Sequence, residues 1–245
     1  MLPWAMLAGL RLAVAADTLT VFAAADLRPA FEQIGPAFTR ATGQEVVLVF
    51  GSTGSLAAQI ERGAPADLFF SADQGAVAAL TAKGILVAGS DRVYALGHLV
   101  LATRRQAPGR VRRLADLTRS DIVRVAIANP DYAPYGRAAR EALLSAGLWD
   151  ALEPKLVIAE NVRQAAQYLQ TGAVEAAILS RSVASDPALA TADVEPTRYR
   201  PIVQAAAIVA GTPRLQLAER FLDFVTGDAG WAIMQRYGFT RPVDP

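Results

Sequence analysis

Three hydroxyl side chains and two glycines follow directly after an apolar run, in the segment FGSTGS (residues 50–55). The run EVVLVF predicts a strand, and LAAQIERG has helical spacing, so the hydroxyls stand where a strand turns into a helix. Backbone N–H groups at a helix start have no partner inside the helix and carry the positive end of its dipole. Such a junction is suited to binding an anion.

Three further strand-to-helix junctions carry comparable residues. Asp26 is a natural N-cap for a helix that runs to about residue 42, and Pro134 stands just ahead of a helix that begins near Tyr135. Asn161, followed three residues later by Gln164, resembles a capping box. An anion site forms if these helix starts converge, and convergence is a hypothesis that the sequence alone does not test.

Alternating strands and helices must position these junctions. Six short apolar runs each precede a helical pattern: LTVFAAA, VVLVF, DLFFSA, IVRVAIA, KLVIAE and EAAILS. Repeated strand-then-helix order predicts an α/β protein with mostly parallel sheets flanked by helices. Ligands in such folds bind beyond the carboxyl ends of the strands, where the helices begin.

Length and composition fit a globular protein. The 245 residues suffice for one large domain or for two lobes of about a hundred residues each. Hydrophobic residues make up 53% and charged residues 19%, and the net charge is +1. A charge so close to zero gives no reason to expect a nucleic-acid partner. The basic run RRQAPGRVRR (104–113) is interpreted as a solvated loop.

The side chains that most enzymes need are scarce. The chain has no cysteine, and its only histidine, His98, lies in the apolar segment ALGHLVLAT, where a structural role is expected. FGSTGS lacks the lysine of a nucleotide phosphate loop, and no nucleophile motif stands near a base. We therefore expect a protein that is not an enzyme.

The first sixteen residues, MLPWAMLAGLRLAVAA, are apolar and end in small residues. This pattern is typical of a secretory signal peptide, which is too short to span a bilayer. The basic start of such a peptide is missing, so the peptide is expected to be truncated at its beginning. Export to the periplasm, with cleavage near residue 16, is the expectation.

Long segments of the chain resemble the molybdate-binding periplasmic proteins of ABC importers. The resemblance is carried by GSTGSLAAQI, GAPADLFFSAD and NPDYAPYGR, and it continues to FLDFVTGDAGWAIMQRYGF near the end of the chain. It covers nearly all of the sequence after the signal segment.

The resemblance implies a two-lobed periplasmic-binding-protein fold of type II. One lobe would contain residues 17–97 and 202–245, and the other residues 98–201. The segments YALGHLVLAT and YRPIVQAAAIVA would then be the two crossover strands between the lobes.

The resemblance also implies a ligand and partners. Members of this family hold molybdate or tungstate between the lobes with hydroxyls and backbone amides, and deliver it to a membrane permease. No cofactor and no coordinated metal cation are expected, and transport by lobe closure needs only a monomer. The oxyanion-binding residues implied by the matching motifs are Ala25, Asp26, Ser52, Thr53, Tyr135 and the amide of Val162.

Two positions depart from the family pattern. Relatives usually offer a serine, threonine or asparagine in the first junction, where this chain has Ala25 and Asp26. Ser180 stands where some relatives have a tyrosine, which leaves Tyr135 as the expected phenol contact. Thr53 is the hydroxyl from which we expect the largest contribution.

Asp26 conflicts with an anionic ligand. A carboxylate about 4 Å from a dianion would cost on the order of several kcal/mol at an intermediate dielectric. Asp26 must therefore point away, be protonated or be offset by a cation. We expect its carboxylate to fold back onto the N–H groups of its own helix as an N-cap. As a second hypothesis, Arg28, Arg137 and Arg163 near the helix starts offset Asp26 or give the cleft a positive field that attracts the anion.

Other functions stay open at the level of sequence. The same fold binds other anions, such as sulfate, phosphate, chromate or a small organic acid, and Ala25 with Asp26 alters the binding edge. A ligand-sensing domain of a transcription regulator shares this fold but would need an N-terminal DNA-binding module, where this chain has only its apolar leader.

Overall fold

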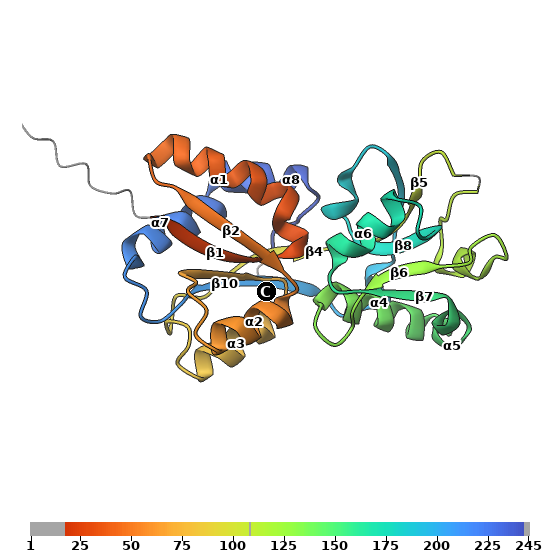
Figure 1. Ribbon diagram of the computed structural model, residues 1–245, viewed down its shortest axis with the longest axis horizontal. Helices are drawn as coiled ribbons and strands as arrows, with labels where there is room; N and C mark the ends of the chain where they lie inside the picture. The colour runs from red at the N-terminus through yellow and green to blue at the C-terminus, as the bar shows by residue number, and fades with distance from the viewer. Residues whose placement is uncertain (1–17, 108, 243–245) are drawn as a thin grey trace, which may run out of the picture.

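Two lobes, each built on one five-stranded sheet, make up the protein (Figure 1). The computed structural model describes residues 18–107 and 109–242. The expected signal peptide, residues 1–16, lies outside the described residues.

The elements of the first lobe alternate between strand and helix, and the chain returns to this lobe at its end. They are β1 (Leu19–Ala24), η1 (Ala25–Leu27), α1 (Arg28–Thr42), β2 (Val46–Gly51), α2 (Thr53–Glu61), β3 (Leu68–Ser71), α3 (Gln74–Ala82), β4 (Arg92–Gly97), β10 (Ile202–Ile208), α7 (Leu215–Thr226) and α8 (Asp228–Arg236).

The second lobe is formed by the middle of the chain. Its elements are β5 (Leu99–Arg104), η2 (Leu114–Thr118), β6 (Val125–Ala128), α4 (Pro134–Ser145), α5 (Trp149–Leu152), η3 (Glu153–Lys155), β7 (Leu156–Ala159), α6 (Val162–Gln170), β8 (Ala176–Ser180), η4 (Val183–Ser185), β9 (Leu189–Asp193) and η5 (Pro196–Arg198). All six apolar runs that the sequence singled out are strands.

Both sheets are mixed. The strand order is β2-β1-β3-β10-β4 in the first lobe and β7-β6-β8-β5-β9 in the second. Strands β1, β2 and β3 run parallel, as do β6, β7 and β8. β10 and β5 run antiparallel to their neighbours because each belongs to a connection between the lobes. The carboxyl ends of the parallel strands therefore stay together on the side that faces the other lobe.

The chain passes between the lobes at two places that lie side by side. Gly97 ends β4 and β5 begins at Leu99, while the return passes through Pro201 into β10. His98 stands at the first crossing, where its Nε2 is 2.8 Å from Oγ1 of Thr240. This contact fits the structural role expected for the histidine.

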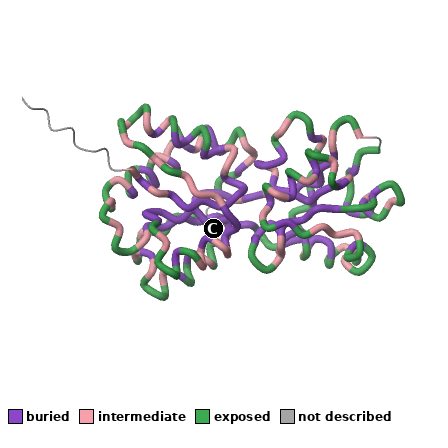
Figure 2. The backbone as a smooth tube through the Cα atoms, viewed as in Figure 1, coloured by how far each residue is buried: buried purple, intermediate pink, exposed green. Residues whose placement is uncertain are grey.

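Helices cover both faces of each sheet and bury its inner strands, while the edge strands β2, β4, β7 and β9 stay partly exposed (Figures 1 and 2). Helix α1 illustrates why, since Phe31, Ile34 and Phe38 recur at helical spacing and are fully buried. The helix ends at Gly43, whose φ of 72° suits a glycine. Within residues 18–107 and 109–242, no helix combines the length and apolar character needed to cross a bilayer.

Four aromatic rings form the centre of the first lobe. The ring centroids of Phe31 and Phe70 are 5.0 Å apart, those of Phe38 and Phe221 are 5.0 Å apart, and those of Phe70 and Phe221 are 5.9 Å apart. All of these pairs pack edge to face, which aromatic quadrupoles favour. The cluster joins β3, α1 and α7, so a helix from near the end of the chain is fixed to the N-terminal part of the lobe.

Replacing the ring shared by these contacts tests this packing. Phe221→Ala removes a fully buried side chain and is expected to lower the free energy of unfolding by about 3–5 kcal/mol. Leu144→Ala, at an exposed position of α4, is the control and should change it by less than about 0.5 kcal/mol. Chemical denaturation measures both, and equal effects of the two changes would show that the aromatic cluster contributes little.

Candidate functional site

The four junctions singled out by the sequence converge on one small cavity between the lobes. Its lining residues come from the end of β1 and the η1 turn that precedes α1, from the starts of α2, α4 and α6, and from the residue after β3: Ala24, Ala25, Asp26, Ser52, Thr53, Ala72, Ala133, Pro134, Tyr135, Asn161 and Val162. All six residues expected at the site are among them. The cavity measures about 10 Å³, close to the room that one water molecule needs. A larger ligand would therefore require the lobes to separate slightly.

The FGSTGS loop supplies one wall of this cavity. Ser52 is the N-cap of α2, and its Oγ accepts a bond from the N–H of Ser55 at 3.3 Å and donates to Oγ of Ser55 at 2.7 Å. Oγ1 of Thr53 accepts from the N–H of Ala72 at 3.0 Å. The proton of Ser52 is thus already used, whereas Thr53 donates its proton to no described residue. Thr53 is the better donor to a ligand in the cavity.

Gly54 brings the backbones of the two lobes into direct contact. Its N–H donates to the carbonyl oxygen of Tyr132 in the other lobe at 2.9 Å. A Cβ at Gly54 would lie 2.9 Å from that oxygen and 3.1 Å from Cα of Tyr132. Only a glycine permits this approach.

The second lobe contributes backbone N–H groups. Asn161 caps α6 by accepting from the N–H groups of Arg163 and Gln164, both at 3.1 Å. This leaves the N–H of Val162 without an acceptor among the described residues. The N–H of Tyr135, at the start of α4, also finds no acceptor within the described part of the chain. Both residues line the cavity, so both groups are available to an anion.

The expectation that Asp26 caps its own helix was wrong. Residues 25–27 form a short 3-10 turn, and α1 begins after Leu27 with no capping bond from a side chain. The carboxyl group of Asp26 turns instead toward Tyr135 on α4 and Gln204 on crossover strand β10. These two buried donors account for the orientation, because buried donors are costly to leave unpaired.

Asp26 is the centre of a buried polar cluster. Its Oδ2 accepts from the hydroxyl of Tyr135 at 2.9 Å and from Nε2 of Gln204 at 2.6 Å. Oε1 of Gln204 accepts from the hydroxyl of Tyr94 at 2.7 Å. A Cβ at Gly97 would overlap the Tyr135 hydroxyl, so the glycine leaves room for the cluster. The hydroxyl that we expected to contact the ligand donates its proton to Asp26.

One oxygen of this carboxyl group has no partner. Asp26 is 1% exposed, and its Oδ1 is buried without a hydrogen bond. Burial raises the pKa of Asp26 to about 6, and the bonds from Gln204 and Tyr135 offset part of that rise by favouring the charged form. The folded protein thus holds the proton more tightly than the unfolded chain. Stability is lost as pH rises from about 4 to about 6, and that loss persists at higher pH.

Both phenols of the cluster remain neutral. Burial raises the pKa of Tyr94 and of Tyr135 well above the usual value for tyrosine, and the negative charge of Asp26 adds to the shift. The hydroxyls therefore act as donors throughout the physiological pH range.

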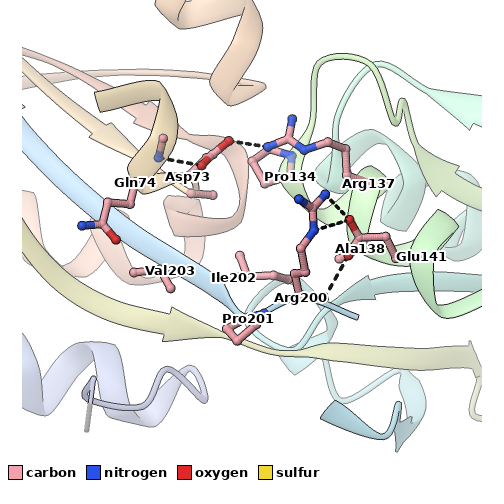
Figure 3. Close-up of a pocket in the computed structure, with 12 residues that line it drawn as sticks. Asp73, Gln74, Pro134, Arg137, Ala138, Glu141, Arg200, Pro201, Ile202 and Val203 are labelled. Atoms are coloured by element: carbon pink, nitrogen blue, oxygen red, sulfur yellow. Dashed lines mark hydrogen bonds and ion pairs between the residues drawn. The ribbon is translucent and has the colours of Figure 1, made fainter. Parts of the chain in front are cut away.

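The arginines near the helix starts do not offset Asp26. Arg28 pairs with Glu32 at 3.1 Å and lies over the ring of Phe50, while Arg163 is exposed. Arg137 forms an ion pair with Asp73 of the other lobe, as Figure 3 shows. Arg28 and Arg137 thus pair with other carboxylates, and no contact joins any of the three arginines to Asp26 within the described part of the chain. That they give the cleft a positive field stays a prediction.

Arg137 and Asp73 stand in a larger groove beside the cavity (Figure 3). The groove measures about 400 Å³ and also contains an ion pair between Glu141 and Arg200. Because its charged side chains are already paired, the groove offers a ligand less than the free donors of the small cavity do.

Contacts of Ser182 and Ser180 complete the junction between the lobes. The hydroxyl of Ser182 donates to the backbone oxygen of Asp26 at 2.8 Å, and Oγ of Ser180 is 3.0 Å from Oγ of Ser182. Ser180 does not line the cavity. Ser180 therefore does not take over the ligand contact expected of a tyrosine at this position.

Sequence reasoning missed Tyr94, Gln204 and Ala72. Tyr94 and Gln204 lie in the crossover strands, which the sequence presented as apolar runs. Gln204 is the only polar residue of its strand, and this isolation in IVQAAAI is the signal that could have indicated a buried partner. Ala72 acts through its backbone N–H, for which no side chain gives a signal.

The chemistry of the cavity is that of an anion receptor. The groups that line it include the hydroxyl of Thr53, the backbone N–H groups of Tyr135 and Val162, and the unpartnered carboxyl oxygen of Asp26. Within residues 18–107 and 109–242, no group of three or more histidine, aspartate or glutamate side chains is placed to hold a metal ion.

Comparison with known proteins gives one consistent picture. The profile of a family described as bacterial extracellular solute-binding protein matches residues 19–240. The molybdate-binding protein ModA of Rhodobacter capsulatus is 34% identical over 236 residues, which cover 96% of this chain and 93% of that protein. ModA of Escherichia coli is 34% identical over 245 residues and covers 95% of each chain.

A solved structure agrees with these relatives. The periplasmic molybdate-binding protein of Azotobacter vinelandii superposes with a TM-score of 0.86 at 32% identity, over 92% of this chain and all of that one. This chain therefore belongs to the family of bacterial extracellular solute-binding proteins that includes these molybdate-binding proteins.

Proposed function

We propose that the protein captures a tetrahedral oxyanion, molybdate or tungstate, between its lobes and delivers it to the membrane permease of an ABC importer. The observation that carries the proposal is the convergence of four helix starts on one cavity lined by buried donors. Molybdate and tungstate are deprotonated at neutral pH and only accept hydrogen bonds, so hydroxyl and N–H groups complement them. The molybdate-binding relatives support this choice of ligand.

The proposed ligand contacts divide between the lobes. Thr53 and the backbone at Ala25 and Asp26 would bind from the first lobe, with Ser52 holding the loop in place. The N–H groups of Tyr135 and Val162 would bind from the second. A ligand held from both sides binds the closed form more tightly than the open form. This difference in affinity determines how far the ligand shifts the equilibrium toward the closed form.

Lobe closure follows from this division. Residues 17–97 with 202–245 would move as one body and residues 98–201 as the other, with the hinge at the two crossings. The contact of Gly54 with Tyr132 and the ion pair of Arg137 with Asp73 would form as the lobes close. The protein would act outside the cytoplasm, in the periplasm, as a monomer that carries no cofactor and binds no nucleic acid.

A thermal-shift screen tests the ligand. Molybdate and tungstate at about a thousand times their dissociation constant are expected to stabilise the protein by about 4 kcal/mol. Sulfate, phosphate and chromate serve as the comparison set. A response to one of these ions alone, with none to molybdate or tungstate, would replace the proposed ligand while leaving the fold and the site in place.

Thr53→Ala tests the hydroxyl of the FGSTGS loop. Loss of the one uncommitted side-chain donor is expected to weaken molybdate binding at least about tenfold in titration calorimetry, equivalent to about 1.4 kcal/mol. Thr53→Ser keeps the hydroxyl and should stay within about threefold of the original affinity. If both variants bind as tightly as the original protein, the backbone amides alone hold the ligand.

Gly54→Ala tests closure. The added methyl group would meet the backbone of Tyr132, so the lobes should stop short of full closure and molybdate affinity should fall about tenfold or more. Gly35→Ala is the control, because its Cβ would meet only a side chain of the same lobe at 3.5 Å. Calorimetry gives the affinities, and small-angle scattering with ligand gives the compactness. An unchanged affinity in Gly54→Ala would show that closure does not require this contact.

A further inference from the structure

The carboxyl group of Asp26 is unexpected in a cavity whose other polar groups are donors. Asp26 lines the cavity and is almost fully buried. Its Oδ2 is occupied by Tyr135 and Gln204, while Oδ1 has no partner among the described residues. A buried polar atom without a partner is uncommon in native proteins and indicates a role beyond contacts within the chain.

Within residues 18–107 and 109–242, no cation is placed to neutralise this group. The titratable side chains that face Asp26 are the phenols of Tyr94 from β4 and Tyr135 from α4. The other neighbours are neutral, namely Gln204 from β10 and Ser182 beside η4. The nearest arginine in sequence, Arg28, is paired with Glu32. An ionised Asp26 would therefore repel a bound dianion with no compensating charge.

A proton on Oδ1 removes this conflict. A neutral carboxylic acid carries one O–H donor, and the donors of Tyr135 and Gln204 hold Oδ2 as the acceptor oxygen. The remaining oxygen, Oδ1, would then carry the proton and present it to the cavity that Asp26 lines.

We propose that Asp26 binds the oxyanion as a neutral carboxylic acid, with Oδ1 donating a hydrogen bond to a ligand oxygen. Asp26 is thereby a ligand-binding residue whose proton is taken up from solvent when the dianion binds. The inference rests on the proposed function, since it requires a fully deprotonated oxyanion in this cavity.

The ligand-free pKa fixes the direction of the pH dependence. Asp26 titrates near pH 6 without ligand, so it is ionised at higher pH and must gain a proton on binding. The complex then holds one proton more than the free protein, and affinity falls about tenfold for each pH unit above about 6. Below about pH 6 the acid is already protonated, and affinity is independent of pH.

Counting protons during binding tests this directly. Calorimetric titration with molybdate at about pH 7.5, in two buffers of different ionisation enthalpy, should show uptake of about one proton. The uptake should drop below about half a proton near pH 5.5. Asp26→Asn, which keeps the shape and always offers an N–H donor, should bind molybdate without proton uptake and with an affinity that does not change between about pH 6 and about pH 8.

Two further variants test whether the proton uptake belongs to Asp26 and depends on its hydrogen bonds. Tyr135→Phe removes a bond that favours the charged form, so the fall in affinity should begin at higher pH. Asp67→Asn is the control, because Asp67 is the other buried aspartate and bonds to Thr212 at the opposite end of β3. It should leave the proton uptake unchanged.

The outcomes distinguish the two proposals. Tight molybdate binding by the original protein with no proton uptake, or equal uptake by Asp26→Asn, would overturn the role of Asp26 and leave the proposed function standing. If neither protein binds molybdate or tungstate at any pH in this range, the proposed function fails and the inference fails with it.

Discussion

The buried carboxyl group of Asp26 connects all the parts that must move or bind. It accepts hydrogen bonds from Tyr135 on α4 of the second lobe and from Gln204 on crossover strand β10. Gln204 in turn accepts a hydrogen bond from Tyr94 on β4. Few polar contacts in this interior are shared so widely, and a buried hydrogen bond is costly to leave unmade. The contact between the lobes, the lining of the cavity and two of the strands next to the crossings are therefore linked through a single side chain.

This coupling sets a compromise between stability and recognition. Burial of a carboxyl group costs stability at neutral pH, since its pKa is raised to about 6. A serine or an asparagine in the same place would avoid that cost. The acid lines the cavity between the lobes, so the cost falls on the same region that the proposed ligand would stabilise.

The sequence predicted the framework of the site better than its polar interior. Short apolar runs and helix-start residues determine where the strands end, and parallel strands bring those ends together at one edge of a sheet. The convergence of the strand-to-helix junctions therefore followed from local patterns. The orientation of Asp26 could not be read in this way. Whether its carboxyl group caps a helix or turns to Gln204 depends on residues 178 positions away in the chain, whose register only the folded sheet defines.

The contact between Gly54 and Tyr132 has a practical consequence. It uses only backbone atoms of Tyr132, and the phenol of that residue is 54% exposed at the edge between the lobes. The side chain at this position can therefore be exchanged without altering the contact itself. Because the chain contains no cysteine, Tyr132→Cys would give a single thiol for attaching an environment-sensitive dye, and the protein would become an optical sensor for its own ligand.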